Sequence, residues 1–172
     1  VGGPKTALPH PIDDATPLAV GDVLIPWGSG QLGGYHSELE RTMILGKPSD
    51  RQRYFFEHML EAQQTALDAI RPGIPCSEVN DAVQRYFDAH SLQPYVRHHS
   101  GHGLGMEIHE SPFLDSGDQT VIEPGMCFSC EPGLYVPGVG GFRHSETVVV
   151  TETGRDILTT YPRDLESLII PC

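Results

Sequence analysis

Glycine and proline interrupt this chain so often that helices are confined to two segments. The sequence holds 19 glycines and 15 prolines among 172 residues, and both residue types disfavour the interior of helices and central strands. Residues 49–71 and 76–93 lack both, and their apolar residues recur with helical spacing. The remaining segments are short and strand-like. This order of elements predicts an α+β fold with a mostly antiparallel sheet backed by helices.

The first helix is expected directly after Pro48. Ser49 and Gln52 have the S-x-x-Q spacing of a capping box, and Pro72 ends the helix. Its buried face is expected to comprise Phe56, Met59, Leu60, Gln63, Leu67 and Ile70. The second helix is expected over residues 77–89, with a buried stripe of Val79, Ala82, Val83, Tyr86 and Phe87.

Short strands are expected in the rest of the chain. Residues 1–17 contain four prolines and are expected to form a loop. The glycine-rich residues 28–34 are expected to connect the first two strands. The expected strands comprise residues 22–26, 35–44, 97–99, 105–109, 126–131, 133–136 and 142–151.

The charge of the chain bears on its partners. With 23 acidic and 11 basic residues, the net charge is −12, whereas nucleic acids and anionic membranes are bound by clustered Lys and Arg. We therefore expect neither of them as a partner.

The apolar runs are far shorter than the roughly 20 residues needed to cross a bilayer. The chain opens on Val1 without an initiator methionine or a signal peptide, so we expect a cytoplasmic protein that is truncated at its N-terminus.

Polar residues gather on the strand expected over residues 35–44. With a period of two, His36, Glu38, Glu40 and Thr42 share one face. Burying two carboxylates and an imidazole without partners would be costly. Taken by itself, this pattern therefore favours a solvated outer face.

Histidines gather in residues 98–112. Three glycines surround His102 and allow a close backbone approach, which suits an imidazole held beside a ligand or metal. Of the adjacent residues His98 and His99, at most one can face the same cleft as His102. His109 follows in the same segment. We interpret this segment as part of a functional site.

Two later segments carry further candidates. Glu131 ends an apolar strand directly before Pro132, and Arg143 lies on a strand that alone is typical of ordinary surface. Cys127 and Cys130 form a single C-x-x-C pair, whereas a zinc ribbon needs two such pairs. We therefore expect two packed core cysteines.

These segments follow one another in the order of a known family. They are residues 3–10 (G-P-K-T-A-L-P-H), 34–42 (G-Y-H-S-E-L-E-R-T), 101–110 (G-H-G-L-G-M-E-I-H-E), 123–126 (E-P-G-M), 131–133 (E-P-G) and 143–148 (R-H-S-E-T-V). They resemble the pita-bread hydrolases, which include creatinase, Xaa-Pro dipeptidase (prolidase), aminopeptidase P and methionine aminopeptidase. The resemblance implies that residues 1–172 are the latter part of a pita-bread catalytic domain. It also implies a small-molecule or peptide substrate, and a homodimer for the full-length protein.

The resemblance bears on a metal site. The metallopeptidases of this family hold two divalent metals with five side chains, whose positions here are Pro26, Glu38, His102, Glu131 and Ser145. Proline and serine are poor ligands, so we expect a degenerate site without a cofactor. The alternative is manganese, cobalt or zinc bound by Glu38, His102 and Glu131.

The residues at 39–42 (L-E-R-T) are similar to those of creatinase, which works without a metal. That resemblance implies His10 as general acid and base, with Glu40 and Glu131 holding a cationic, amidinium-like group. His109 would orient the substrate or the attacking water. Arg143 would bind a substrate carboxylate or support Glu131, and His99 is a further candidate for substrate binding.

Three functions remain open at this point. The first is a metal-free hydrolase that cleaves a C–N bond of a small amide, amidine or Xaa-Pro-type substrate. The second is a metal-dependent Xaa-Pro peptidase. The third is a catalytically silent family member that binds a peptide or protein.

Overall fold

The computed structural model describes residues 1–12 and 15–172. The short 3₁₀ turns are η1 (Gly3–Ala7), η2 (Gln93–Tyr95) and η3 (Glu166–Leu168), and the helices are α1 (Asp50–Ala69) and α2 (Cys76–Ala89). The strands are β1 (Val23–Leu24), β2 (Trp27–Leu32), β3 (Tyr35–Glu40), β4 (Met43–Leu45), β5 (Gly101–Gly103), β6 (Glu110–Leu114), β7 (Cys127–Cys130), β8 (Gly133–Val136), β9 (Gly140–Arg143), β10 (Glu146–Val150), β11 (Arg155–Ile157) and β12 (Ile169–Ile170).

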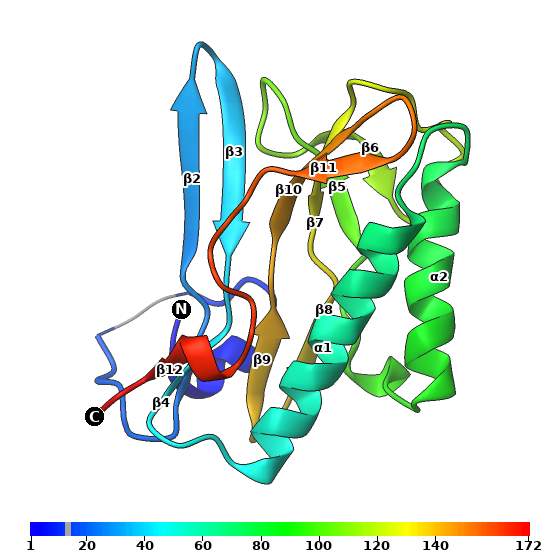
Figure 1. Ribbon diagram of the computed structural model, residues 1–172. Helices are drawn as coiled ribbons and strands as arrows, with labels where there is room; N and C mark the ends of the chain where they lie inside the picture. The colour runs from blue at the N-terminus through cyan, green and yellow to red at the C-terminus, as the bar shows by residue number, and fades with distance from the viewer. Residues whose placement is uncertain (13–14) are drawn as a thin grey trace.

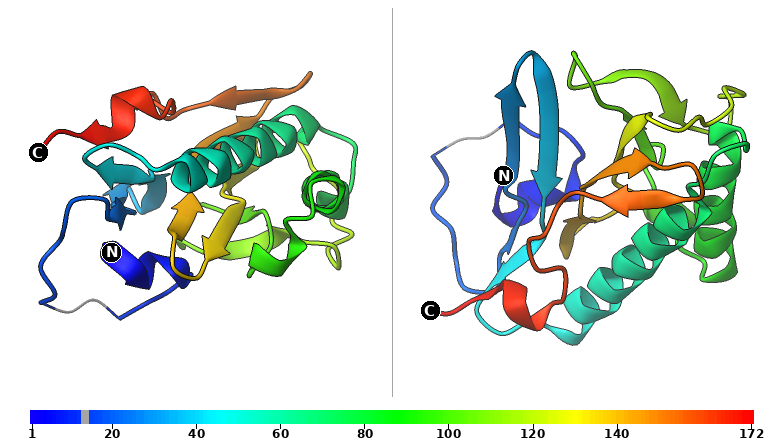
Figure 2. Two further views of the ribbon diagram at one scale, coloured as in Figure 1. Left: turned by 90° about the horizontal axis from the view of Figure 1, so that it is seen from below. Right: turned by 45° about the horizontal axis from the view of Figure 1, so that its top comes forward.

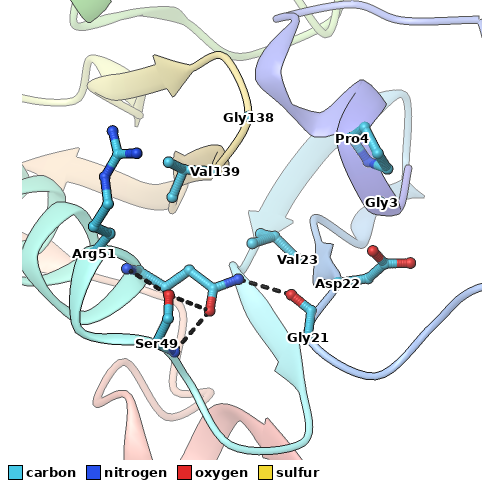
Figure 3. Close-up of a pocket in the computed structure, with 10 residues that line it drawn as sticks. Gly3, Pro4, Gly21, Asp22, Val23, Ser49, Arg51, Gly138 and Val139 are labelled. Carbon is cyan, nitrogen blue, oxygen red and sulfur yellow. Dashed lines mark hydrogen bonds between the residues drawn. The ribbon is translucent and has the colours of Figure 1, made fainter.

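Both expected helices are confirmed, because their signals are local. The Ser49 hydroxyl accepts a hydrogen bond from the Gln52 backbone N–H, while the Ser49 N–H donates to the Gln52 amide, which completes the capping box. The Gln52 side chain also donates to the Gly21 carbonyl. This cap lies beside a hollow of about 280 Å³ between η1, β1 and the start of α1 (Figure 3). The hollow lies apart from the histidines and carboxylates that the sequence singles out.

The five-stranded sheet forms the centre of the molecule, in the order β11-β10-β7-β5-β6. Every pair of neighbours in this sheet is antiparallel. Helices α1 and α2 lie side by side, away from the projecting β2–β3 hairpin (Figures 1 and 2). The helices and strands bury one core, which includes Phe56, Met59, Leu67, Val79, Val83, Phe87, Leu114, Phe128, Leu134, Phe142 and Val148. Cys130 is buried in it and Cys127 is half-buried, both as free thiols.

The expected glycine-rich connection is wrong, because residues 27–32 form strand β2. This strand pairs with β3 from Trp27 opposite Glu40 to Leu32 opposite Tyr35. Gly33 and Gly34 both have positive φ angles, of 61° and 90°, as a two-residue hairpin turn requires. The glycines that suggested a loop therefore serve the turn and an exposed strand.

Strand boundaries differ where tertiary pairing decides them. The expected strand over residues 35–44 is interrupted after β3, and only Val23–Leu24 of residues 22–26 are paired. Residues 97–99 and 105–109 form no strand. Instead, residues 101–103 form β5, which pairs with β7. A Cβ atom at position 101 would overlap the Ser129 carbonyl oxygen, so this close pairing requires a glycine there. The expected strand 142–151 is split into β9, which pairs with β8, and β10, which pairs with β7.

The N-terminal segment is anchored on β9 through a close backbone contact. The Gly141 N–H donates to the Thr6 hydroxyl, and a Cβ at position 141 would overlap the Thr6 carbonyl oxygen. We expect Gly141→Ala to lower the free energy of unfolding by about 1–3 kcal/mol, because the backbone must shift to admit the methyl group. Urea denaturation measures this loss. Gly154→Ala is the matched control, since no atom lies within 4 Å of its Cβ position. Equal effects of the two substitutions would contradict the prediction.

Across the described residues, the helices are too short or too polar to span a bilayer.

Candidate active site

A cavity of about 320 Å³ opens between the N-terminal segment, β3 and the central strands. It combines acidic, basic and apolar side chains, as small-molecule sites do. The residues that line it are Val1, Pro9, His10, Pro11, Ile25, Trp27, Glu38, Glu40, His109, Glu131 and Arg143. Most of the residues that the sequence singles out therefore converge on one place.

Glu38 lies on strand β3 and is buried because β3 lies beside β10 (Figure 1). The Glu38 backbone N–H donates to the Thr147 hydroxyl, which donates in turn to the Glu38 carbonyl. The Ser129 hydroxyl donates to Glu38 Oε1 over 3.0 Å. Glu38 and Glu40 are each only 2% exposed. The solvated face expected from the strand pattern is therefore wrong.

His102 is fully buried on β5 and presents one ring nitrogen to two carboxylates. Its Nδ1 lies 3.0 Å from the Gly103 carbonyl, which can only accept, so Nδ1 carries a proton. Nε2 then lies 3.4 Å from Glu131 Oε1 and 3.7 Å from Glu38 Oε2. A backbone acceptor on the far nitrogen is the usual arrangement around a metal-binding histidine.

Two buried atoms in this group have no hydrogen-bond partner, namely His102 Nε2 and Glu38 Oε2. Unpaired buried polar atoms are costly. The ring centroids of His109 and His102 lie 4.0 Å apart. One possible ligand atom each of His102, His109 and Glu131 lies within 4.8 Å of the other two. A divalent cation would satisfy the unpaired atoms, so these residues fit a metal.

Arg143 lies between two carboxylates. Its Nη2 donates to Glu40 Oε1 over 2.7 Å and its Nε donates to Glu40 Oε2, while Nε is also 3.7 Å from Glu131 Oε2. Its Nη1 donates to the Tyr135 hydroxyl over 3.1 Å. A bidentate carboxylate–guanidinium pair of this kind is strong and directional. Both Glu40 oxygens are thus engaged within the chain.

The charges in the site act on its carboxylates and imidazoles. Burial alone would raise the pKa of Glu131, but His102 and Arg143 lower it to about 2. Burial raises the pKa of Glu38, and the neighbouring charge of Glu131 adds to this. Burial would lower the pKa of His102, but Glu131 and the Gly103 carbonyl raise it. Burial and the neighbouring His102 lower the pKa of His109. Glu131 is therefore an anion that attracts positive charge.

The sequence of residues 1–152 matches the family model of metallopeptidase family M24. This match covers most of the chain, including every motif quoted from the sequence. The chain belongs to metallopeptidase family M24.

Known M24 relatives resemble the chain in sequence and in fold. An Xaa-Pro dipeptidase of Pyrococcus furiosus is 36% identical over 163 residues, which are 95% of this chain and 47% of the relative. The structure of dipeptidase PepE from Mycobacterium ulcerans superposes with a TM-score of 0.94, at 35% identity, over 99% of this chain and 46% of that chain. The prolidase from Pyrococcus horikoshii gives a TM-score of 0.92 at 33% identity, over 95% and 47% of the two chains.

These comparisons confirm the expected pita-bread fold. The chain spans about half the length of the curated relatives it matches. The homodimer stays a prediction.

The predicted site residues of this M24 chain fall into two groups. His10, Glu38, Glu40, His109, Glu131 and Arg143 line the cavity, and His102 lies against Glu38 and Glu131. His99 instead packs edge-on against Phe113, with ring centroids 5.5 Å apart. The roles assigned to all these residues stay predictions.

Tyr135 is the residue of the M24 site that sequence reasoning missed. It is 1% exposed within the apolar strand β8, so its hydroxyl could not be told from core packing by pattern alone. The hydroxyl accepts from Arg143 and lies 2.7 Å from His98 Nε2. Its position two residues after the E-P-G motif is the signal that could have found it.

His98 is held neutral by its surroundings. Its Nδ1 lies 2.7 Å from the His99 carbonyl and must donate to it, so Nε2 accepts from Tyr135. Burial lowers the pKa of His98 to about 4, whereas a histidine in the unfolded chain has a pKa near 6.5. The unfolded chain therefore binds more protons between these values. The neutral imidazole contributes stability above about pH 6.5 that is lost as the pH falls toward 4.

We expect His98→Gln, which keeps an acceptor for Tyr135 without titrating, to flatten the pH dependence of stability. The measurement is the free energy of unfolding of both proteins between pH 4 and 7. The wild type should lose more stability than the variant as the pH falls through this range. NMR should also show a His98 imidazole that titrates near pH 4. Identical pH slopes for the two proteins would contradict the prediction.

Proposed function

We propose that this protein hydrolyses the amide bond of small peptides of the Xaa-Pro type with the help of a divalent cation such as manganese, cobalt or zinc. The observation that carries the proposal is the buried pair of unpartnered atoms, His102 Nε2 and Glu38 Oε2. They lie beside Glu131 and His109, the other donors of the cluster. The names of the relatives, among them Xaa-Pro dipeptidase and prolidase, support the substrate class.

The donor set consists of Glu38, His102, His109 and Glu131. Carboxylate and imidazole donors together suit manganese, cobalt and zinc. Lewis acidity toward a carbonyl group is the chemistry that such a cation supplies when bound.

The residues of the chain itself supply binding and proton transfer. His10 and His109 are exposed in the cavity, and imidazole is the side chain best suited to moving a proton at neutral pH. His10, which lies outside the donor set, can take a proton from the attacking water and deliver it to the leaving amine. Ile25 and Trp27, with Pro9 and Pro11, form an apolar wall. A pyrrolidine ring fits such a surface because it has no N–H or hydroxyl to satisfy.

The metal-free alternative depends on Glu40 in a way that the geometry disfavours. The creatinase resemblance implied that Glu40 and Glu131 hold a cationic group of the substrate. Both oxygens of Glu40 already accept from Arg143. A cationic substrate would have to displace a buried guanidinium, so the metal-dependent peptidase is the better-supported function.

The test is release of proline from Xaa-Pro dipeptides by the intact protein, after chelation and after reloading with Mn²⁺, Co²⁺ or Zn²⁺. We expect hydrolysis only after reloading, and slower cleavage of matched Xaa-Ala dipeptides. Metal-independent cleavage of small guanidino compounds would replace this proposal with the metal-free hydrolase. Peptide binding without turnover under every condition would replace it with the silent binding protein.

A further inference from the structure

Trp27 places an indole ring beside the carboxylates of the cavity. It begins strand β2 and pairs directly with Glu40 of β3. Directly opposite residues of two antiparallel strands project to the same face. The Glu40 carboxylate is held by Arg143, which lines the cavity with it. The indole therefore projects toward the cavity as well, and it is among the residues that line it.

The indole is left uncovered by the rest of the chain. Trp27 is 51% exposed, whereas tryptophan is highly buried on average. Within the part of the chain that the structure describes, its ring contacts no other aromatic ring and its N–H has no hydrogen-bond acceptor. A second hollow of about 320 Å³, which Leu39, Met43 and Tyr161 help to line, also adjoins it. The ring is therefore free to contact a ligand in the cavity.

An indole ring favours one class of chemical group. Aromatic rings pair with it in offset or edge-to-face arrangements, and such pairs contribute more than the apolar area they bury. Proline is saturated, and Pro9, Pro11 and Ile25 already offer it an apolar surface in the cavity. In a dipeptide of the Xaa-Pro type, an aromatic ring therefore has to belong to Xaa.

We propose that Trp27 selects Xaa-Pro dipeptides with an aromatic Xaa, by packing the ring of Xaa against its indole. This inference rests on the proposed function, because it concerns the substrate of the same cavity. Trp27 is then a specificity-determining residue, whose contribution differs between substrates. Loss of a donor such as Glu131 would instead affect every substrate alike.

The first measurement is kcat/KM of the intact, Mn²⁺-loaded protein for Phe-Pro and for Ala-Pro, in the wild type and in Trp27→Leu. Leucine keeps an apolar side chain but has no ring to pair with. We expect the variant to lose about 3- to 10-fold for Phe-Pro and less than about 2-fold for Ala-Pro. Tyr161→Leu is the matched control, because Tyr161 is an exposed aromatic residue outside the cavity lining. It should keep the wild-type values for both dipeptides.

The second measurement follows binding rather than turnover. Trp27 is the single tryptophan of the sequence, and the difference in fluorescence between the wild type and Trp27→Leu isolates its indole. Rapid mixing of the Mn²⁺-loaded protein with saturating Phe-Pro should shift this difference spectrum before proline is released. Saturating Ala-Pro should shift it less.

Two results would overturn the inference and leave the proposed function standing. One is an equal change in kcat/KM for the two dipeptides in Trp27→Leu. The other is hydrolysis of Phe-Pro without a shift of the Trp27 fluorescence. Failure to hydrolyse any Xaa-Pro dipeptide after metal loading would instead refute the proposed function itself.

Discussion

Glu131→Gln is expected to abolish metal binding and proline release in the intact protein. Glu131 is the carboxylate that contacts both His102 Nε2, at 3.4 Å, and Arg143, at 3.7 Å. Its pKa of about 2 reflects how strongly these partners favour the anion. Glutamine has the same shape but brings one oxygen without charge. The affinity for Mn²⁺ should therefore fall by more than the roughly 100-fold that loss of an outer partner typically costs.

Isothermal titration with Mn²⁺ and the dipeptide assay measure the two losses. Glu123→Gln is the control, because Glu123 is exposed and lies outside the residues that line the cavity. The control should bind and hydrolyse like the wild type. A Glu131→Gln protein that is folded and keeps wild-type affinity for Mn²⁺ would remove Glu131 from the donor set.

The second large effect is expected on stability, from Arg41→Met. Arg41 is 2% exposed, and its Nη2 donates over 2.7 Å to Glu146, which is fully buried. Its other donors reach the backbone carbonyls of Glu40, Ser145, Tyr161 and Pro162. Removing one partner of a buried ion pair typically costs about 3–5 kcal/mol, because the remaining charge is left in the interior. Arg163 Nε still lies 3.4 Å from Glu146 Oε1 in this variant, so we expect a loss near the lower end of this range in the free energy of unfolding.

Urea denaturation of the metal-free protein measures the loss directly. Arg53→Met serves as the control, because the Arg53–Glu166 pair lies on the surface and an exposed pair contributes roughly 0–1 kcal/mol. The double variant Arg41→Met with Glu146→Leu should recover part of the stability, because no buried charge is left alone. A loss below about 1 kcal/mol in Arg41→Met would show that the pair contributes no more than a surface pair.

The helices could be predicted closely because their signals lie within a few residues of each other. Ser49 and Gln52 form a cap across one turn, and Pro72 prevents continuation. The second helix begins one residue earlier than expected, at Cys76. Strands depend on the partner with which they pair, and β2 shows this even though its partner β3 is the next strand along the chain. Its glycines suggest a loop until the register with β3 is known.

The candidate site also could be predicted only in part, because the sequence gives the order of its motifs but not their arrangement in space. The motifs around His10, Glu38, His102, Glu131 and Arg143 were sufficient to predict the family and the residues that gather at one cavity. They also indicated that Pro26 and Ser145 bring no metal ligand. The strand patterns taken alone suggested, in contrast, that the faces bearing Glu40 and Arg143 are ordinary surface, although both residues are buried.

The sequence by itself determined the two helices, the family and the chemical types of the donor atoms. Only the tertiary structure decided which carboxylate is free for a cation and which is neutralised within the chain. Glu40 and Arg143 are 103 residues apart and meet because the backbone of Ser145 pairs with that of Glu40. A local pattern records the residue types and their alternation along one strand. Burial and ion pairing depend on which strands come together, and that is decided by the free energy of the whole fold.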